Sequence, residues 1–355
     1  MHQTPTTLTE VTSEWLSDAL GRQVDDLTVQ PIAAGEGFMG QLARVRIISP
    51  LVSSGDLPAT MIVKLPTGDP GGQVMGQMMR VWEREHCFYR DVAPHMNVRV
   101  PSVYVNIADP PCLVLEDLAP ARPGDHVAGA TIEQADQSID VLARHHAHWF
   151  QHPMLAELNW MPALDDPSVE TIGPVFEMGW PVFLQRYESQ LPARCLRWCE
   201  RFVTDLPTWI GGHFDDPITI THGDFRLDNL FFLGNGDVAI IDWQLSMRAP
   251  GQADLVYFCA NNLTTPMRRV HEQRLIQRYV DGVHAAGVPT DSVTLDGVRR
   301  GYLEGLVFYA ATFGAGLLSI DPANDRGVAL FDALVMRTFA AVEDLDAGAA
   351  IGIDG

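Results

Sequence analysis

The stretch that most constrains the fold of this chain is residues 219–244, with the sequence TITHGDFRLDNLFFLGNGDVAIIDWQ. Two short apolar runs, 230–233 and 238–241, flank a Gly-Asn-Gly sequence, and this pattern predicts a β-hairpin. Three polar residues, His222, Asp224 and Asn229, come before the first run, and Asp242 follows the second. Because a hairpin brings its two ends together, we expect two carboxylates and one amide to lie at one end of a rigid element.

Such a cluster of carboxylates is unfavourable without a partner, since like charges repel each other and raise each other's pKa. A divalent metal ion with phosphate oxygens is a suitable partner, because Mg²⁺ is commonly held by one or two protein carboxylates together with substrate phosphates. The hairpin therefore suggests phosphoryl transfer, and the rest of the chain can be searched for the other parts of such a site.

Composition limits the other classes of function. The 355 residues allow two domains or lobes, and the net charge of −21 argues against nucleic acid or an anionic membrane as the main partner. The polar N-terminus does not have the pattern of a signal peptide, and the longest apolar run, 305–320, contains several glycines and is short for a membrane span. The five cysteines form no C-x-x-C pair and suggest a reduced, cytoplasmic protein.

Lysine is almost absent from the chain. Of the 24 basic residues, 23 are arginine and only Lys64 is lysine. A bias toward arginine explains the 23 but not the exception, because the two side chains differ where a compact point charge is needed, as at a nucleotide phosphate. Lys64 lies in an apolar segment, 60–65, that predicts a strand.

A G-x-G-x-x-G sequence precedes this strand, with its glycines at Gly35, Gly37 and Gly40. The same spacing occurs in dinucleotide-binding folds, but there the loop opens a helix. Here the following residues, 41–48, alternate in polarity and predict a strand, so the segment reads as a hairpin whose glycines let the backbone approach phosphates closely. A plain β-turn is the simpler alternative.

The remaining elements divide the chain near residues 116–124, which are polar and then rich in Pro and Gly. Before this point we expect about five strands, loops at 50–58 and 66–73, and one helix over 74–92 that carries Glu83 and Glu85. After it the chain is mainly helical apart from the hairpin. Expected helices there cover 132–150, 174–191, 193–206, 267–286, 295–320 and 327–347.

The order of these parts, a glycine hairpin, a strand lysine, a helix glutamate and then H-G-D-x-x-x-x-N, is that of the protein-kinase template. The sequence HGDFRLDN resembles the catalytic loop of the aminoglycoside phosphotransferase and choline kinase superfamily, and IDWQ takes the place of the kinase Asp-Phe-Gly. The stretch IDWQLSMRAPGQADLVYF is most similar to the ecdysteroid-kinase-like branch. The superfamily's hinge is similar to residues 113–118, LVLEDL. Its helix with the ion-pair glutamate is similar to residues 83–94, EREHCFYRDVAP.

This resemblance implies an α+β, bilobal, protein-kinase-like fold. A small antiparallel β lobe with one helix would span residues 1–117, and a larger, mainly helical lobe with the catalytic loop and substrate cleft would span 118–355. The departures from the kinase pattern are Trp243-Gln244 for Phe-Gly, His-Gly-Asp for His-Arg-Asp, and the lack of an activation segment. A protein substrate and a phosphorylation switch are therefore not expected.

The resemblance also implies a role for each candidate residue. Asp224 would accept or orient the substrate hydroxyl, and Asn229 and Asp242 would hold Mg²⁺. Lys64 would bind the ATP phosphates and pair with Glu85, with Glu83 as the alternative. His222 and Asp254 would brace the loop, and Arg226 and Asp228 are structural or substrate-facing. The nucleotide would be bound by the loop Gly35, Gly37, Phe38, Met39 and Gly40, and by the hinge Glu116, Asp117 and Leu118.

The implied activity is transfer of the ATP γ-phosphate to a hydroxyl of a small organic molecule. A sterol-like or other apolar alcohol is favoured by the ecdysteroid-kinase-like resemblance, and an aminoglycoside or a choline-like cation is the alternative that fits the acidic composition. Neither nucleic-acid binding nor membrane insertion is expected, and the oligomeric state stays open. Two other classes are a non-catalytic nucleotide-binding pseudokinase and a nicotinamide-dependent oxidoreductase.

Overall fold

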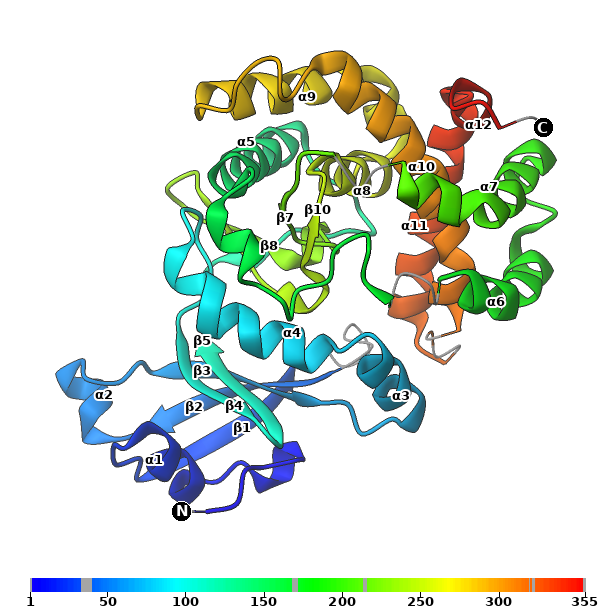
Figure 1. Cartoon of the computed structure of the whole chain (residues 1–355). Helices are drawn as coiled ribbons and strands as arrows, with labels where there is room; N and C mark the ends of the chain where they lie inside the picture. Colours follow the sequence, from blue (N-terminus) through cyan, green and yellow to red (C-terminus); the bar gives the residue numbers. More distant parts are fainter. Residues whose placement is uncertain are drawn as a thin grey trace. The chain divides into compact units, whose positions relative to one another are not determined.

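A computed structural model of the chain describes residues 2–32, 40–167, 172–212, 216–318, 320 and 323–353 (Figure 1). The chain forms two compact units. The first comprises residues 1–96 and 100–120, and the second comprises residues 97–99 and 121–355. Within the described residues, no helix is both long enough and apolar enough to cross a membrane.

The first unit is built on a five-stranded antiparallel sheet in the order β1-β2-β3-β5-β4. Its strands are β1 (Asp26–Ile32), β2 (Gly40–Ile48), β3 (Thr60–Pro66), β4 (Val103–Ala108) and β5 (Pro111–Glu116). Its helices are α1 (Ser13–Leu20), α2 (Pro50–Ser54), α3 (Pro70–Met78) and α4 (Val81–Cys87), and a π-helical turn, Phe88–Val92, continues α4.

The two faces of this sheet carry different side chains. Met61, Val63 and Leu65 of β3 are fully buried and belong to one apolar cluster with Trp15 and residues around α1. Because successive side chains of a strand point to opposite faces, Lys64 lies on the other face, where Figure 1 shows α4. The sheet thus separates the core of this unit from its lone lysine.

Three expectations for the first unit were wrong. The helix expected over 74–92 is broken, because Arg80 takes a left-handed conformation (φ 53°) between α3 and α4. The loop expected at 66–73 ends where α3 begins, since the side chain of Asp69 accepts a hydrogen bond from the Gly72 amide and caps the helix. The loop expected at 50–58 contains α2, which Ser49 caps in the same way.

The second unit is mainly helical. Its longer helices are α5 (Ile132–Trp149), α6 (Ile172–Tyr187), α7 (Ala193–Gly211), α8 (Gln252–Asn262), α9 (Thr265–Ala285), α10 (Leu295–Leu317) and α11 (Asp325–Asp344). A short α12 (Ala347–Ala350) follows α11 near the end of the chain. Helix α8 was not expected, because its polar first turn is continuous with the hairpin motif.

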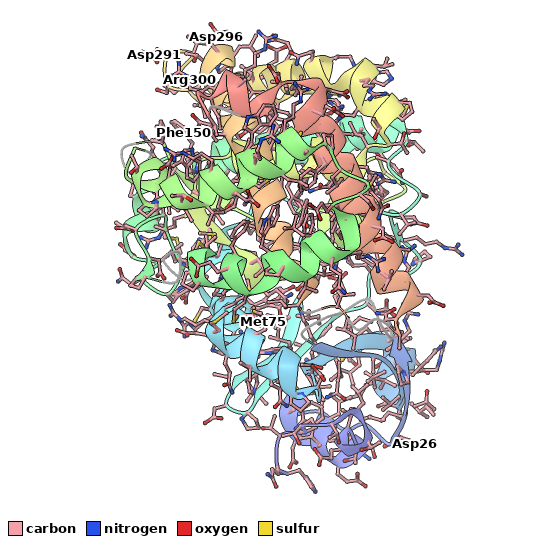
Figure 2. All side chains as sticks on the ribbon, turned by 90° about the vertical axis from the view of Figure 1, so that its right-hand side faces the viewer. Asp26, Met75, Phe150, Asp291, Asp296 and Arg300 are labelled. Carbon is pink, nitrogen blue, oxygen red and sulfur yellow. The ribbon has the colours of Figure 1, made fainter. Side chains whose placement is uncertain are left out.

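Helix α10 is central among these helices and contacts α6, α7, α8 and α11 (Figures 1 and 2). Two of its glycines allow close approach. A Cβ at Gly305 would lie 3.0 Å from Val256 of α8, and one at Gly314 would lie 3.3 Å from the backbone of Trp180 of α6. The glycines of this apolar run therefore serve helix packing.

Two small sheets hold the hairpin motif. The expected hairpin is confirmed as β8 (Leu230–Phe232) paired antiparallel with β9 (Val238–Ile240), and β6 (Arg122–Pro123) extends it on the β8 side. Before and after it, β7 (Thr219–Thr221) pairs with β10 (Met247–Ala249). The polar residues of the motif lie in the two loops, 222–229 and 241–246, that connect these sheets.

Candidate active site

The first unit contains a buried ion pair between its strand lysine and α4. The Nζ atom of Lys64 lies 2.8 Å from Oε1 and 2.7 Å from Oε2 of Glu85. The two side chains are 8% and 1% exposed, so the pair is removed from water. Trp82 lies beside it, with the ring centroid 5.8 Å from Nζ.

Glu83 takes a different partner. Its carboxylate accepts two hydrogen bonds from the guanidinium of Arg80, at 2.7 and 2.9 Å, on the exposed side of the helix. The hydrogen bonds of Arg80 lower the pKa of Glu83. Of the two glutamates that the sequence offered, the structure brings Glu85 to Lys64.

The predicted nucleotide-binding residues fall into two groups. Gly35, Gly37, Phe38 and Met39 lie outside the described residues, and Gly40 is the first residue of β2. The second group is the predicted hinge, Glu116, Asp117 and Leu118. The backbone amide of Glu116 donates to the Ser102 carbonyl at 2.8 Å, so this amide is not available to bind adenine.

Asp117 also makes contacts within the first unit. Arg44 donates two hydrogen bonds to its carboxylate, at 2.6 and 3.1 Å, and the Ala119 amide donates a third. Burial alone would raise the pKa of Asp117, but the hydrogen bonds of Arg44 and Ala119 outweigh it and lower the pKa. The sequence did not suggest this role for Asp117, which fixes the chain just before Leu118.

In the second unit, Asp254 of α8 holds the loop that follows β7. Its two carboxylate oxygens accept hydrogen bonds from the backbone amides of His222 (2.6 Å) and Gly223 (2.9 Å). Its side chain is fully buried, and His146 of α5 contacts it at 3.2 Å. His146 in turn contacts the Tyr279 hydroxyl of α9 at 2.8 Å. Three helices therefore fix the backbone just before Asp224.

Gly223 is required by the shape of this loop. It has a φ of 80°, and a Cβ placed on it would lie 2.2 Å from the carbonyl oxygen of Leu245. The left-handed conformation and the close approach both exclude a side chain here. The motif His-Gly-Asp thus has a steric reason for its glycine.

His222 links the two loops of the site. Its Nδ1 accepts a hydrogen bond from the Asp224 amide (3.2 Å), and its Nε2 donates to the carbonyl of Ile241 (2.8 Å), a tautomer that we assign from these partners. The ring packs edge-on against Trp243, with centroids 4.7 Å apart. His222 therefore spans the loop that carries Asp224 and the loop that carries Asp242.

Three side chains surround the carboxylate of Asp224. Tyr257 of α8 donates to Oδ1 at 2.8 Å, and Arg226 (2.9 Å) and Asn229 (3.0 Å) donate to Oδ2. The contact with Tyr257 was missed by the sequence reasoning. The only sequence feature that pointed to Tyr257 is its position as an aromatic residue about one turn after Asp254. Because α8 was not predicted, that spacing could not be recognised as one face of a helix.

These contacts set the protonation state of Asp224. Burial alone would raise the pKa of the carboxyl group, but the charge of Arg226, the nearby His222 and the hydrogen bond from Tyr257 outweigh burial and lower the pKa. Burial also raises the pKa of Tyr257 well above its ordinary value, and the Asp224 charge adds to this rise, so the phenol remains a donor. Asp224 is consequently ionised at neutral pH.

Arg226 bridges Asp224 and Asp228, and the loop is anchored further by α8. Arg226 donates to Asp228 at 3.1 Å. The Asn262 side chain accepts from the Leu227 amide (2.7 Å) and donates to the Phe225 carbonyl (3.3 Å). In this geometry Arg226 orients the carboxylate, while Asn262, which the sequence did not suggest, holds the loop backbone.

The proposed metal ligands lie on adjacent segments. The side-chain nitrogen of Asn229 donates to Asp224, so the side-chain oxygen of Asn229 points away from Asp224. The backbone amide of Ile241 donates to the backbone carbonyl of Asn229 at 3.0 Å. Asp242 follows directly, in a left-handed conformation with φ 67°. One amide oxygen and one carboxylate are hard oxygen donors, and they fit a Mg²⁺ ion that takes its other ligands from phosphate and water.

Comparison with known proteins agrees with this geometry. Residues 56–287 match the model of a family described as the phosphotransferase enzyme family. The sequence has no match among the curated proteins compared with it. Solved structures of similar fold include an ethanolamine kinase from Plasmodium vivax, with a TM-score of 0.56 and 12% identity over 88% of this chain and 82% of that one.

Two further structures have similar scores. A choline kinase from Cryptosporidium parvum has a TM-score of 0.55 and 12% identity over 90% of this chain and 91% of that one. A spectinomycin phosphotransferase in complex with ADP and spectinomycin has a TM-score of 0.56 and 14% identity over 99% and 100%. These similarities confirm the α+β, kinase-like fold class.

The superfamily expected from HGDFRLDN is confirmed as well, whereas the ecdysteroid-kinase-like branch stays a prediction. The family match overturns the oxidoreductase alternative, and β2, which begins at Gly40, is the strand expected after the glycines in place of a helix. Because the family model covers well over half of the sequence, the chain belongs to the phosphotransferase enzyme family.

Proposed function

We propose that this phosphotransferase is a small-molecule kinase that transfers the γ-phosphate of ATP to a hydroxyl group. The observation that carries the proposal is the set of contacts around Asp224. Both carboxylate oxygens accept hydrogen bonds, the loop backbone is held by Asp254, and Asn229 and Asp242 follow on segments joined by a backbone hydrogen bond. This arrangement holds a carboxylate and a pair of oxygen ligands in fixed positions.

In the proposed reaction Asp224 accepts a hydrogen bond from the acceptor hydroxyl and orients its oxygen toward the γ-phosphorus. Its lowered pKa makes Asp224 a weak base, so positioning contributes more than early proton removal, as is common in phosphoryl transfer. Arg226 and Tyr257 restrict the rotation of the carboxylate. Asn229 and Asp242 would hold Mg²⁺, which when bound neutralises charge on the phosphate oxygens.

We assign the nucleotide phosphates to Lys64, with Glu85 as the residue that orients it. The ion pair places a point charge near the end of a mostly apolar strand, which suits a polyphosphate. The residues Gly35, Gly37, Phe38, Met39 and Gly40 are proposed to cover the phosphates, and backbone groups near Leu118 to bind adenine. ATP rather than another nucleotide is part of this proposal.

The acceptor is proposed to be a hydroxylated small molecule. A sterol-like or other apolar alcohol is our first choice, and an aminoglycoside or a choline-like compound is the alternative. The solved structures of similar fold are named for ethanolamine, choline and spectinomycin, and this range supports a small hydroxylated acceptor without selecting one.

A screen for acceptor-dependent ADP release tests the proposal. The panel would contain apolar alcohols, amino alcohols and hydroxylated antibiotics, each with ATP and Mg²⁺. With an acceptor in hand, Asp224→Asn should lower kcat by about 10²- to 10⁴-fold, the range for removing a positioned acid–base group. Asp237→Asn, in the turn of the same hairpin, should leave kcat unchanged.

The non-catalytic alternative makes the opposite forecast. If the protein bound ATP but ADP release stayed at the same level in wild type and Asp224→Asn across the whole panel, the chain would be a nucleotide-binding protein without kinase activity. Equal thermal unfolding midpoints of the two proteins would show that the comparison was made on folded material.

A further inference from the structure

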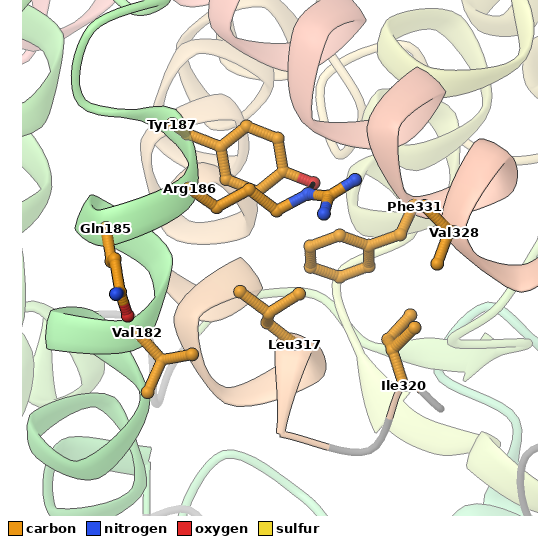
Figure 3. A pocket seen from close by; sticks show the side chains of 8 residues that line it. All are labelled: Val182, Gln185, Arg186, Tyr187, Leu317, Ile320, Val328 and Phe331. Atoms are coloured by element: carbon orange, nitrogen blue, oxygen red, sulfur yellow. Dashed lines mark hydrogen bonds between the residues drawn. The ribbon is translucent and has the colours of Figure 1, made fainter. Parts of the chain in front are cut away.

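A cavity of about 380 Å³ lies among α6, the end of α10 and the start of α11 (Figure 3). Eight residues line it: Val182, Gln185, Arg186, Tyr187, Leu317, Ile320, Val328 and Phe331. Its volume falls within the range of about 300 to 1,000 Å³ that is usual for small-molecule sites. All of its lining residues belong to the second unit, as does Asp224.

The lining is apolar and contains no carboxylate. Six of the eight side chains are aliphatic or aromatic, and the other two, Gln185 and Arg186, are exposed. Figure 3 shows Leu317, Phe331 and Ile320 together on one side of the space. A ligand would therefore meet hydrocarbon over most of its surface.

The one charge in the lining is already neutralised. The guanidinium of Arg186 donates to the carboxylate of Asp332 at 2.9 Å, and Tyr187 donates to the same carboxylate. An anion would have to compete with Asp332 for Arg186. A cation would find no carboxylate in the lining, because Asp332, which pairs with Arg186 and Tyr187, is not one of the lining residues. An uncharged ligand fits this chemistry best.

Helix α10 connects this cavity to Asp224. Tyr309 of α10 packs edge-on against Tyr257, with ring centroids 5.1 Å apart, and Tyr257 donates its hydroxyl hydrogen bond to Asp224. Leu317, which lines the cavity, lies eight residues further along the same helix. At a rise of 1.5 Å per residue, Leu317 lies about 12 Å along the helix axis from Tyr309, which is on the scale of a medium-sized organic molecule.

We propose that this cavity receives the apolar body of the acceptor, so that the substrate is an uncharged alcohol whose hydroxyl lies at Asp224. The inference rests on the proposed kinase function and selects among its acceptors. It favours a lipophilic alcohol, whose carbon skeleton lies along α10, over an aminoglycoside or a choline-like cation. The specificity-determining residues would then be Leu317, Val328 and Phe331.

Binding can be measured without phosphoryl transfer, with the uncharged fluorescent probe N-phenyl-1-naphthylamine. Wild type should bind the probe saturably, and 1-decanol should displace it. Val328→Trp fills the cavity and should weaken probe binding at least tenfold. Val182 lies at the rim of the cavity and is 44% exposed. Val182→Trp should also weaken probe binding, and it provides a second variant if Val328→Trp folds poorly.

Met336→Trp is the matched control, since Met336 is 41% exposed on the same helix as Val328 but does not line the cavity. It should bind the probe as wild type does. Thermal unfolding midpoints of all variants would identify a folding defect. Absence of saturable binding to wild type, or equal binding by Val328→Trp, Val182→Trp and wild type, would overturn the assignment of the cavity.

The link to catalysis needs a second measurement, ADP release with 1-alkanols of four to ten carbons and with choline. Burial of each added methylene should raise kcat/KM about fourfold in wild type. The rise should flatten in Val328→Trp for the longer alkanols, whose chains reach the cavity, and persist in Met336→Trp. A preference for choline, or a flat series in wild type, would overturn the inference while the kinase function stands. Absence of ADP release with every acceptor would instead count against the kinase function, because probe binding is independent of it.

Discussion

Lys64 and Glu85 form the most completely buried ion pair that the first unit shows among its described residues. Breaking one partner of a buried pair leaves an uncompensated charge, which commonly costs about 3 to 5 kcal/mol. We therefore expect Glu85→Gln to lower the free energy of unfolding by that amount, as measured by urea denaturation. Glu83→Gln is the control, because it breaks an exposed pair with Arg80 and should cost less than about 1 kcal/mol.

Equal losses in the two variants would contradict this account of Lys64. They would mean that the buried glutamate contributes no more to the free energy of unfolding than an exposed one does. The assignment of Glu85 as the residue that orients Lys64 would then be wrong.

Tyr257 adds to the effect of the Arg226 and His222 charges on the protonation of Asp224 through one hydrogen bond. That bond favours the carboxylate, so its removal in Tyr257→Phe should raise the pKa of Asp224. The ionised carboxylate is the active form. As the pH falls, the variant should therefore lose activity at a higher pH than wild type does. The pH profile of kcat/KM measures this shift of its acid limb. Tyr309→Phe keeps the hydrogen bond and should leave the limb in place.

At the scale of the elements, the loop between β7 and β8 depends on the conformation of one glycine. Gly223→Ala places a Cβ 2.2 Å from the Leu245 carbonyl oxygen at a φ of 80°, and we expect it to cost about 3 kcal/mol or more and to abolish activity. Gly236→Ala is a matched control, since Gly236 has a φ of 83° but nothing within 4 Å of its Cβ position.

The control isolates the clash from the backbone strain. Gly236→Ala should cost only about 1 kcal/mol, the usual penalty for a left-handed alanine, and keep its activity. Thermal unfolding followed by circular dichroism and assays of ADP release on both variants would separate the effect of the clash from the effect of the backbone strain. Similar behaviour of the two would mean that the loop accommodates a side chain by moving Leu245.

Local patterns predicted the elements with a clear period and missed those that depend on caps. The alternation of residues 41–48 and the Gly-Asn-Gly turn were sufficient for β2 and for the β8–β9 hairpin. In contrast, α2 and α3 start at prolines after the capping residues Ser49 and Asp69, and these short helices lack an apolar period long enough to recognise. The break at Arg80 leaves no mark in the hydrophobic pattern of 74–92.

At the scale of the whole molecule, we propose that residues 1–117 and 118–355 behave as separate domains. Calorimetry should then show two unfolding transitions, and Glu85→Gln should lower only the one that belongs to the first unit. A single transition, shifted as a whole by Glu85→Gln, would contradict this division.

The sequence by itself determined which chemistry the chain could carry. The motif around Asp224, the lone lysine on a strand and the hairpin before Asp242 follow from residue types and short spacings, since backbone preferences and side-chain alternation act over a few residues. These features led to the kinase-like fold class and to the phosphotransferase family.

Only the tertiary structure decided the partners. Glu83 and Glu85 are equivalent in the sequence, yet residues two apart on a helix point to nearly opposite sides, and packing on the sheet placed Glu85 beside Lys64. The Tyr257 contact to Asp224, the Asn262 anchor and the cavity along α10 join residues distant in the chain. Such contacts arise when whole helices pack against one another, and no local pattern records which side chains will then meet.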